Sequence, residues 1–186
     1  LFINDEKLTP DVKAYLTAQG VQTAPYNHIK DALRNYGEYN ILLDPNVISY
    51  TLFKQVRTQE IVRASSPIPA MKAIKNEIEV EGFRRSMIRD GVALVKFLRW
   101  LQTAVVKGQE TEISVAEKLT ALRAEQSLFR GISFDTIAGY EAHGAIVHYE
   151  ATPETDVAVE PRGLVLIDSG AQYEDGTTDI TRTIAL

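Results

Sequence analysis

Cysteine is absent from the 186-residue sequence, which excludes a disulfide scaffold and any thiolate metal site. Side chains of this sequence can therefore bind a metal only through oxygen or imidazole groups. The sequence also has no apolar run near the roughly 18 residues of a membrane span, and no signal-like N-terminus. With a net charge of -5 and no basic stripe, it lacks the surface that nucleic acids require. We therefore expect a cytoplasmic protein that binds neither membranes nor nucleic acid.

The rest of the composition is that of an ordinary globular protein. Hydrophobic residues make up 45% and charged residues 24%, and the length suits one good core or one and a half small ones. Pro67 and Pro69 bracket a single residue, and such a pair continues neither a helix nor a central strand. They predict a connector between a domain of residues 1–68 and a domain of residues 69–186.

The first domain alternates strand and helix signals. Strands are expected at residues 1–3, 21–26, 40–44 and 61–62, with helices beginning near Thr9, Asn27 and Asn46. This alternating order predicts a mixed or parallel sheet with helices packed on it.

The second domain begins with a long helix. Asn76 and Glu79 form a capping-box pattern that predicts its start, and it is expected to continue to about Val106. Its predicted core stripe, at spacings of three and four, consists of Val80, Phe83, Met87, Leu94, Leu98, Leu101 and Val105, with Gly91 filling the remaining step.

A second helix and a sheet follow. Ser114 with Glu117 predicts the cap of this helix, which is expected to end near Gln126. Residues after Phe129 are expected to form strands and turns. Two helices followed by a sheet make this domain α+β.

The most informative stretch is an acidic hairpin at residues 163–183. Residues 163–167 are apolar at nearly every position, as in a strand covered on both faces, and Asp168 ends this strand. A carboxylate in that place loses water, which is costly unless a positive group meets it. On the returning strand, Asp179 shares a face with Thr181 and Thr183. A divalent metal bound by Asp168 and Asp179 would explain this polar face.

The residues alone leave other interpretations of the hairpin open. Asp168 could begin an Asx-type turn with the serine and glycine that follow it. Asp179 could be a solvated carboxylate, or the partner of Arg182. Each of these readings needs no metal.

Geometry also sets a condition on the metal hypothesis. A tight turn centred on Asp175-Gly176 would place Asp168 opposite Thr183. Asp179 would then lie roughly 13 Å from Asp168 along the strand, too far to share one ion. A metal site therefore requires a bulge or a wider loop within residues 170–176.

Three ordered segments resemble one known family. Residues 166–183 read LIDSGAQYEDGTTDITRT, residues 144–149 read GAIVHY, and residues 75–85 contain KNE followed by EGFRR. In their order along the chain, these segments resemble the pita-bread metallopeptidases, and among these the aminopeptidase P (Xaa-Pro aminopeptidase) branch. The resemblance implies the first half of a pita-bread (creatinase/aminopeptidase-like) catalytic domain, preceded by part of a mixed α/β creatinase N-terminal-like domain.

The resemblance also implies an activity and its site. Asp168 and Asp179 match metal ligands, and His148 matches a histidine that contacts substrate near the scissile bond, which makes it both a catalytic and a substrate-binding candidate. The expected cofactor is a pair of divalent ions, foremost Mn²⁺, with Co²⁺ or Zn²⁺ as alternatives because oxygen and imidazole ligands discriminate weakly among them. The expected reaction releases the N-terminal residue of peptides with proline second. Proline-containing peptides are thus the expected partners, and we expect a homodimer for the full-length protein.

The resemblance implies an incomplete site as well. The other ligands of the family are a histidine and two glutamates from the second half of the fold, and none of those motifs occurs here. The chain also starts at Leu1 without a methionine. We therefore expect a fragment that alone lacks peptidase activity and binds metal weakly. His143, in the loop after Tyr140, matches no ligand of the family and is expected to be a loop histidine.

Two alternatives to the aminopeptidase stay open. The first is a prolidase (Xaa-Pro dipeptidase). The SGAQY sequence and the extended N-terminal domain favour the aminopeptidase over this alternative. The second is a non-catalytic pita-bread module that binds proteins. The presence of Asp168, Asp179 and His148 argues against it.

Overall fold

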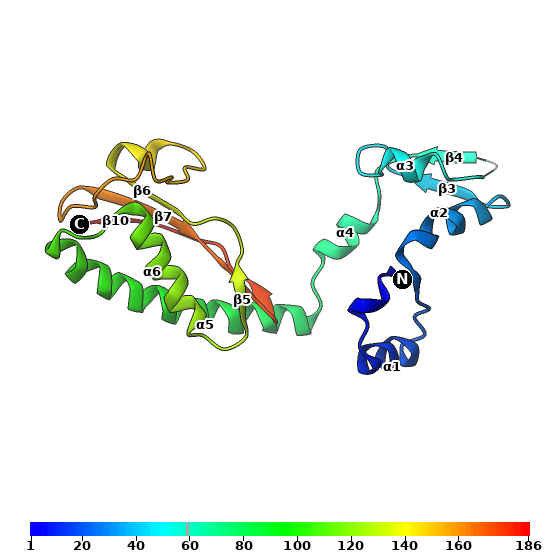
Figure 1. Ribbon diagram of the computed structural model, residues 1–186, viewed down its shortest axis with the longest axis horizontal. Helices are drawn as coiled ribbons and strands as arrows, with labels where there is room; N and C mark the ends of the chain where they lie inside the picture. The colour runs from blue at the N-terminus through cyan, green and yellow to red at the C-terminus, as the bar shows by residue number, and fades with distance from the viewer. Residues whose placement is uncertain (59) are drawn as a thin grey trace. The chain divides into compact units, whose positions relative to one another are not determined.

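Figure 1 shows the chain as a computed structural model, which describes residues 1–58 and 60–186. The chain divides into two compact units, Leu1–Ile74 and Lys75–Leu186. The short helix α4 (Ile68–Ala73) lies where the sequence predicts a proline connector, with Pro69 in its first turn. A helix tolerates proline there because the first N–H groups have no partner within the helix. The domain boundary after residue 68 stays a prediction.

The first unit has the predicted order of elements, with its first three strands shorter and its fourth longer than predicted. Its strands are β1 (Phe2–Ile3), β2 (Ala24–Pro25), β3 (Asn40–Leu43) and β4 (Glu60–Arg63), and its helices are α1 (Pro10–Ala18), α2 (Ile29–Ala32) and α3 (Tyr50–Phe53). The 3-10 turns are η1 (Asp5–Lys7), η2 (Tyr26–His28) and η3 (Leu33–Asn35). Among the described residues, β1 pairs with β2 and β3 with β4, both parallel, as two separate sheets. The prediction of a single sheet is therefore wrong.

The helix predicted from Asn46 begins later for a local reason. The Asp44 side chain accepts a hydrogen bond from the backbone N–H of Asn46 at 3.0 Å, in an Asx-type turn. This turn competes with helix formation, so that α3 starts only at Tyr50.

The second unit opens with the predicted long helix, α5 (Glu77–Ala104), extended by the 3-10 turn η4 (Val105–Lys107). The Asn76 side chain accepts from the Glu79 N–H at 2.9 Å, and the Glu79 carboxylate accepts from the Asn76 N–H at 2.8 Å. These two bonds confirm the capping box and satisfy two N–H groups that the helix leaves free.

The second helix, α6 (Glu112–Ala124), starts earlier than predicted. Its cap is Thr111, whose hydroxyl accepts from the Ser114 N–H at 3.3 Å, while the Ser114 hydroxyl accepts from the Thr111 N–H at 2.8 Å. The prediction of a cap at Ser114 with Glu117 is therefore wrong. Ser114 takes the third position of the box, a place usually held by glutamate or glutamine.

The buried face of α5 matches the predicted stripe only in its C-terminal half. Its buried residues are Gly82, Ser86, Asp90, Ala93, Leu94, Phe97, Leu101 and Ala104. Leu94 and Leu101 were expected there, but Val80 and Met87 are 36% and 43% exposed. Small and polar residues replace them at the interface because a hairpin of the sheet, described below, packs against the start of the helix.

The sheet of the second unit is centred on β7 (Leu164–Ser169), which pairs antiparallel with β6 (Ile137–Tyr140) and β10 (Ile180–Ala185). A second ladder joins β8 (Ala171–Tyr173) to β5 (Phe129–Ile132) and β9 (Gly176–Thr177), all antiparallel. The 3-10 turn η5 (Glu141–Ala145) follows β6. Helices α5 and α6 lie together on one side of β7 and β10 (Figure 1).

The core lies between these helices and one face of the sheet. Phe97 of α5, Leu119 of α6 and two residues of β7, Val165 and Ile167, are at most 1% exposed and belong to one apolar cluster. Leu164, on the other face of β7, is 52% exposed. The prediction of a strand covered on both faces is therefore wrong for the described residues. The helices cover one face of the sheet, and the side chains on the other face are accessible to ligands.

Candidate metal-binding site

Asp168 lies on the free face of the sheet, near the end of β7. It pairs with Ile137 of β6 and with Thr181 of β10, so these three side chains point the same way. Its side chain is partly buried, and its Oδ1 atom has no hydrogen-bond partner among the described residues. A buried carboxylate oxygen without a partner is costly, and a cation is the group that would compensate it.

Asp179 lies on the same face but is exposed. It stands two residues before Thr181, the partner of Asp168, and such diagonal neighbours on antiparallel strands are about 7–8 Å apart. Arg182 pairs with Ile167, on the opposite face, and donates to the Thr181 carbonyl at 2.7 Å. The alternative in which Arg182 pairs with Asp179 is therefore not supported.

The hairpin turn brings the two carboxylates into this relation. Tyr173 pairs with Gly176, so that Glu174 and Asp175 are the central residues of the turn. The turn considered at Asp175-Gly176 is therefore not the one formed, and the observed turn changes the pairing by two residues. Both ladders of the hairpin keep one register, so the expected bulge or wider loop is not found in the described hairpin. The two-residue change is enough to bring Asp179 near Asp168.

Long-range contacts determine where this turn forms. The Asp175 carboxylate accepts from Arg85 Nε at 3.3 Å and forms an ion pair with Arg89, both on α5. A Cβ atom built on Gly82 of α5 would lie 2.1 Å from the Asp175 carbonyl oxygen. Only glycine therefore allows the turn to approach the helix this closely.

The backbone between the two ladders is distorted next to the aspartates. The Thr178 hydroxyl accepts from the Ala171 N–H at 2.9 Å, while the Thr178 carbonyl accepts from the Ser133 hydroxyl at 2.9 Å. A Cβ atom on Gly170 would lie 1.9 Å from that carbonyl. The ladder pairing thus stops at Ser169 with Ile180 and resumes at Gln172 with Thr177 without a change of register, and Gly170 allows the close approach to Thr178.

His148 lies in the connection between η5 and β7. Its side chain is exposed, and no described hydrogen bond joins it to Asp168 or Asp179. Its φ of 55° is in the left-handed region, which costs an ordinary residue about 1 to 2 kcal/mol. A conformation of this kind persists only where the surrounding structure holds it.

A residue that the sequence interpretation missed lies beside this loop. Glu112, the first residue of α6, is fully buried, and its carboxylate accepts from the Tyr149 hydroxyl at 2.8 Å. His143 of η5 approaches it with Nδ1 at 3.0 Å, so the predicted loop histidine has a buried partner. An acidic residue in the first turn of a helix is common, so the sequence offered no signal of this role.

The metal site is incomplete within the described residues. No group of three histidine, aspartate or glutamate side chains there lies close enough to bind one ion. Asp168 and Asp179 are thus two candidate carboxylate ligands, and a metal site would require more.

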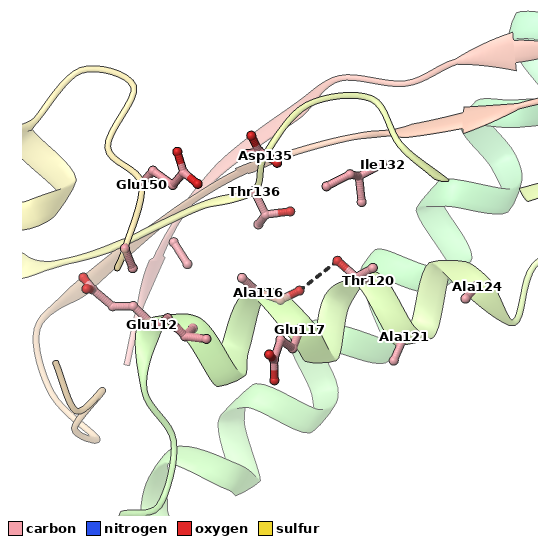
Figure 2. A pocket seen from close by; sticks show the side chains of 13 residues that line it. Glu112, Ala116, Glu117, Thr120, Ala121, Ala124, Ile132, Asp135, Thr136 and Glu150 are labelled. Carbon is pink, nitrogen blue, oxygen red and sulfur yellow. Dashed lines mark hydrogen bonds between the residues drawn. The ribbon is translucent and has the colours of Figure 1, made fainter. Parts of the chain in front are cut away.

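A cleft of about 630 Å³ lies elsewhere, between α6 and the segments around residues 132–138 and 150–151 (Figure 2). Its helix wall contains three alanines, and Glu117, Asp135 and Glu150 are acidic groups at its border. Neither aspartate of the candidate site nor His148 lines it. The cleft is on the helix side of the sheet and is therefore separate from the candidate metal site.

Among the described residues, no helix is both long enough and apolar enough to cross a bilayer.

Two family models match the chain. One, described as metallopeptidase family M24, matches residues 81–186, and the other, a creatinase/prolidase N-terminal domain, matches residues 1–79.

Relatives of known name match the chain along almost its whole length. Xaa-Pro aminopeptidase 1 of Dictyostelium discoideum is 41% identical over 190 residues, which cover 99% of this chain and 30% of the relative. Aminopeptidase P2 of Arabidopsis thaliana is 37% identical over 217 residues, with coverage of 99% and 30%. The chain thus spans about 30% of the length of these relatives.

Solved structures resemble it as well. The X-prolyl aminopeptidase of Caenorhabditis elegans, described as a cytosolic enzyme with a di-nuclear active site, has a TM-score of 0.88 at 32% identity. The match covers 99% of this chain and 31% of that one. The prolidase of Pyrococcus furiosus has a TM-score of 0.71 at 22% identity, over 95% of this chain and 51% of that one, a likeness of fold alone.

Proposed function

Because the chain belongs to metallopeptidase family M24, we propose that it carries part of the active site of an Xaa-Pro aminopeptidase. The sequence motifs predicted both this family and the α+β pita-bread fold class. The proposed reaction is hydrolysis of the first peptide bond in peptides with proline second. One observation carries the proposal most strongly: Asp168 has a buried oxygen without a partner among the described residues, on the face that also bears Asp179.

The residues fit a pair of divalent metal ions, and Mn²⁺ is the proposed species. Hard divalent ions prefer carboxylate oxygen, which is what Asp168 and Asp179 present. Two such ions require more ligands than two carboxylates, so we propose that the others come from a part of the protein outside residues 1–186. The di-nuclear active site named for the Caenorhabditis elegans enzyme supports two ions.

Each residue of this chain has a distinct task in the proposed reaction. Bound metal would supply an activated water and polarise the scissile carbonyl. Asp168, near the end of the central strand β7, and Asp179, directly before β10, would hold the metal through their carboxylates. His148 would contact the substrate next to the scissile bond, for which its exposed ring is suited. Proline-containing peptides are the proposed substrates, and a cytoplasmic homodimer is the proposed state of the whole protein.

Metal titration tests the site directly. Calorimetric titration of the intact protein with Mn²⁺ should show that Asp168→Asn lowers the affinity at least about tenfold, because the variant loses a charged ligand. Asp135→Asn, which changes an exposed aspartate of the same unit, is the matched control and should leave the affinity unchanged. Equal affinities for the two variants would contradict the metal assignment and favour the non-catalytic module.

Substrate comparison tests the reaction. The intact protein should cleave a longer Xaa-Pro peptide faster than an Xaa-Pro dipeptide, and the reverse preference would identify a prolidase. Residues 1–186 alone should be inactive, since they lack a complete set of ligands. Strong Mn²⁺-dependent cleavage by that segment would show this part of the proposal to be wrong.

A further inference from the structure

One buried carboxylate contacts both ends of the loop that carries His148. This loop, residues 143–149, is called the histidine loop below. At its start, His143 Nδ1 lies 3.0 Å from both carboxylate oxygens of Glu112. At its end, the Tyr149 hydroxyl donates to Glu112 Oε2 at 2.8 Å. The two rings also pack against each other, with centroids 4.5 Å apart.

Glu112 is well suited to act as a fixed anchor. Its side chain is 0% exposed, and its backbone belongs to the first turn of α6, on the core side of the unit. Its Oε1 atom also accepts from the backbone N–H of Tyr140, at 2.7 Å, three residues before the loop. Figure 2 shows Glu112 at one end of the cleft, with its carboxylate directed away from the alanines of α6. Three donors thus converge on one carboxylate, a satisfied buried arrangement that rigidifies its members.

The loop between these anchors is wound tightly. The Ile146 N–H donates to the His143 carbonyl at 3.0 Å, and the Tyr149 N–H donates to the Ile146 carbonyl at 3.2 Å. His148 lies within this second turn and has the left-handed backbone described above. Because Tyr149 is the next residue, its bond to Glu112 restrains the backbone at the position where the strain lies.

We propose that Glu112 is a positioning residue of the peptidase site: by binding His143 and Tyr149 it fixes the histidine loop and thereby the direction of the His148 ring. This inference rests on the proposed function, in which His148 contacts the substrate. Glu112 itself touches neither substrate nor metal and lies on the helix side of the sheet. It acts only through the loop.

Hydrogen exchange tests the loop without any need for activity. In the intact protein, Glu112→Gln should raise the exchange rates of amides 144–149 at least about tenfold relative to those of the α5 core, because one amide oxygen cannot accept from three donors. Tyr149→Phe, which removes a single bond and is expected to fold normally, should raise them less. Glu117→Gln, an exposed glutamate of the same helix, is the control and should change nothing. A uniform rise across the unit in Glu112→Gln and no rise in Tyr149→Phe would overturn the proposal.

Kinetics test whether the loop acts through His148. For an Xaa-Pro peptide, Glu112→Gln should lower kcat about 10- to 100-fold, as expected from misplacing a group near the reacting bond. In combination with His148→Ala it should cause no further loss beyond about twofold, because the two changes remove the same contribution. His143→Asn, which keeps a donor near the Nδ1 position, should recover activity relative to His143→Ala.

The two experiments separate this inference from the proposed function. Independent, multiplicative losses from Glu112→Gln and His148→Ala would refute a positioning role. If the unmutated protein cleaves no Xaa-Pro peptide, the proposed function fails, and the exchange pattern alone decides whether Glu112 holds the loop.

Discussion

Replacing Gly82 by alanine should weaken the second unit although alanine is the better helix former. A Cβ atom at this position would lie 2.1 Å from the Asp175 carbonyl oxygen, so the turn would have to retreat by about 1.3 Å to reach a normal contact of 3.4 Å. That movement lengthens the contacts of Asp175 with Arg85 and Arg89. The same movement separates the turn from the helix at Ser86, whose side chain lies against Gly176.

The size of the effect follows from the competing terms. Helix propensity favours alanine over glycine by about 1 kcal/mol. Overpacking against the backbone costs about 1–3 kcal/mol, and a weakened bond between charged groups adds up to about 1.5 kcal/mol. The steric term is larger, and the expected net loss is about 2 kcal/mol of unfolding free energy. Gly91→Ala is the matched control, because nothing lies within 4 Å of a Cβ atom there and the same helix should gain up to about 1 kcal/mol.

Urea unfolding followed by tryptophan fluorescence measures both variants. Trp100 is the one tryptophan of the sequence and lies in α5, so its emission reports on the second unit and not on the first. The two glycine variants should differ by about 3 kcal/mol with opposite signs, on the estimates above. If Gly82→Ala stabilises the unit as Gly91→Ala does, the close approach of the turn to α5 is not a feature of the protein in solution.

Two further predictions concern the buried polar groups beneath the sheet. Arg123→Met should destabilise the second unit by about 3–5 kcal/mol, measured by the same Trp100 signal. Among the described residues, Asp90 would keep only the Tyr173 hydroxyl, at 3.0 Å, as a partner. Stability should also fall as the pH rises above about 10. Burial and the charge of Asp90 raise the pKa of Tyr173, and burial raises the pKa of Tyr149. Both phenols therefore stay protonated to a higher pH in the folded protein than in the unfolded chain. The contribution of each is complete below the unfolded pKa near 10 and is lost as the pH rises toward the folded value. Tyr173→Phe should reduce this dependence, and an unchanged pH profile in that variant would refute the assignment.

Local signals in the sequence predicted the elements that local interactions determine. The capping box at Asn76 needs only residues three positions apart, and the structure confirms both this box and the long helix α5 that it begins. Strand alternation predicted that Asp179 shares a face with Thr181, and the pairing of Thr181 with Asp168 places Asp168 on the face of Thr181. The start of α6 was misplaced because threonine and serine both cap helices, and the sequence does not say which of Thr111 and Ser114 does so.

Features that depend on distant partners were not predictable in the same way. The stripe of α5 was assigned by hydrophobicity, yet Gly82 and Ser86 are buried and Met87 is exposed, because a hairpin packs on that face. Glu112 looked like an ordinary acidic residue in a first helical turn. Its buried role appears only when η5 and Tyr149 are folded against it.

The turn at Glu174 and Asp175 shows how a distant contact determines the relation of the two aspartates. Moved by one residue, to Asp175-Gly176, it would separate Asp168 and Asp179 by roughly 13 Å along the strands. The observed turn instead pairs Asp168 with Thr181, two residues after Asp179, and in a regular ladder such diagonal neighbours are about 7–8 Å apart. Both turns are compatible with the local sequence, so the contacts with α5 decide between them.

We therefore expect the proposed metal site to depend on residues that would not contact the metal. Asp175 is seven residues from Asp168 along the hairpin, and its ion pair with Arg89 joins the turn to α5. We expect this contact to hold the register in which Asp179 lies two residues from Thr181, the partner of Asp168. Arg89→Met should accordingly lower Mn²⁺ affinity in the intact protein, whereas Arg99→Met, farther along the same helix, should not. Unchanged affinity in Arg89→Met would mean that the strands hold their register without the helix, and that the two carboxylates are placed by the sheet alone.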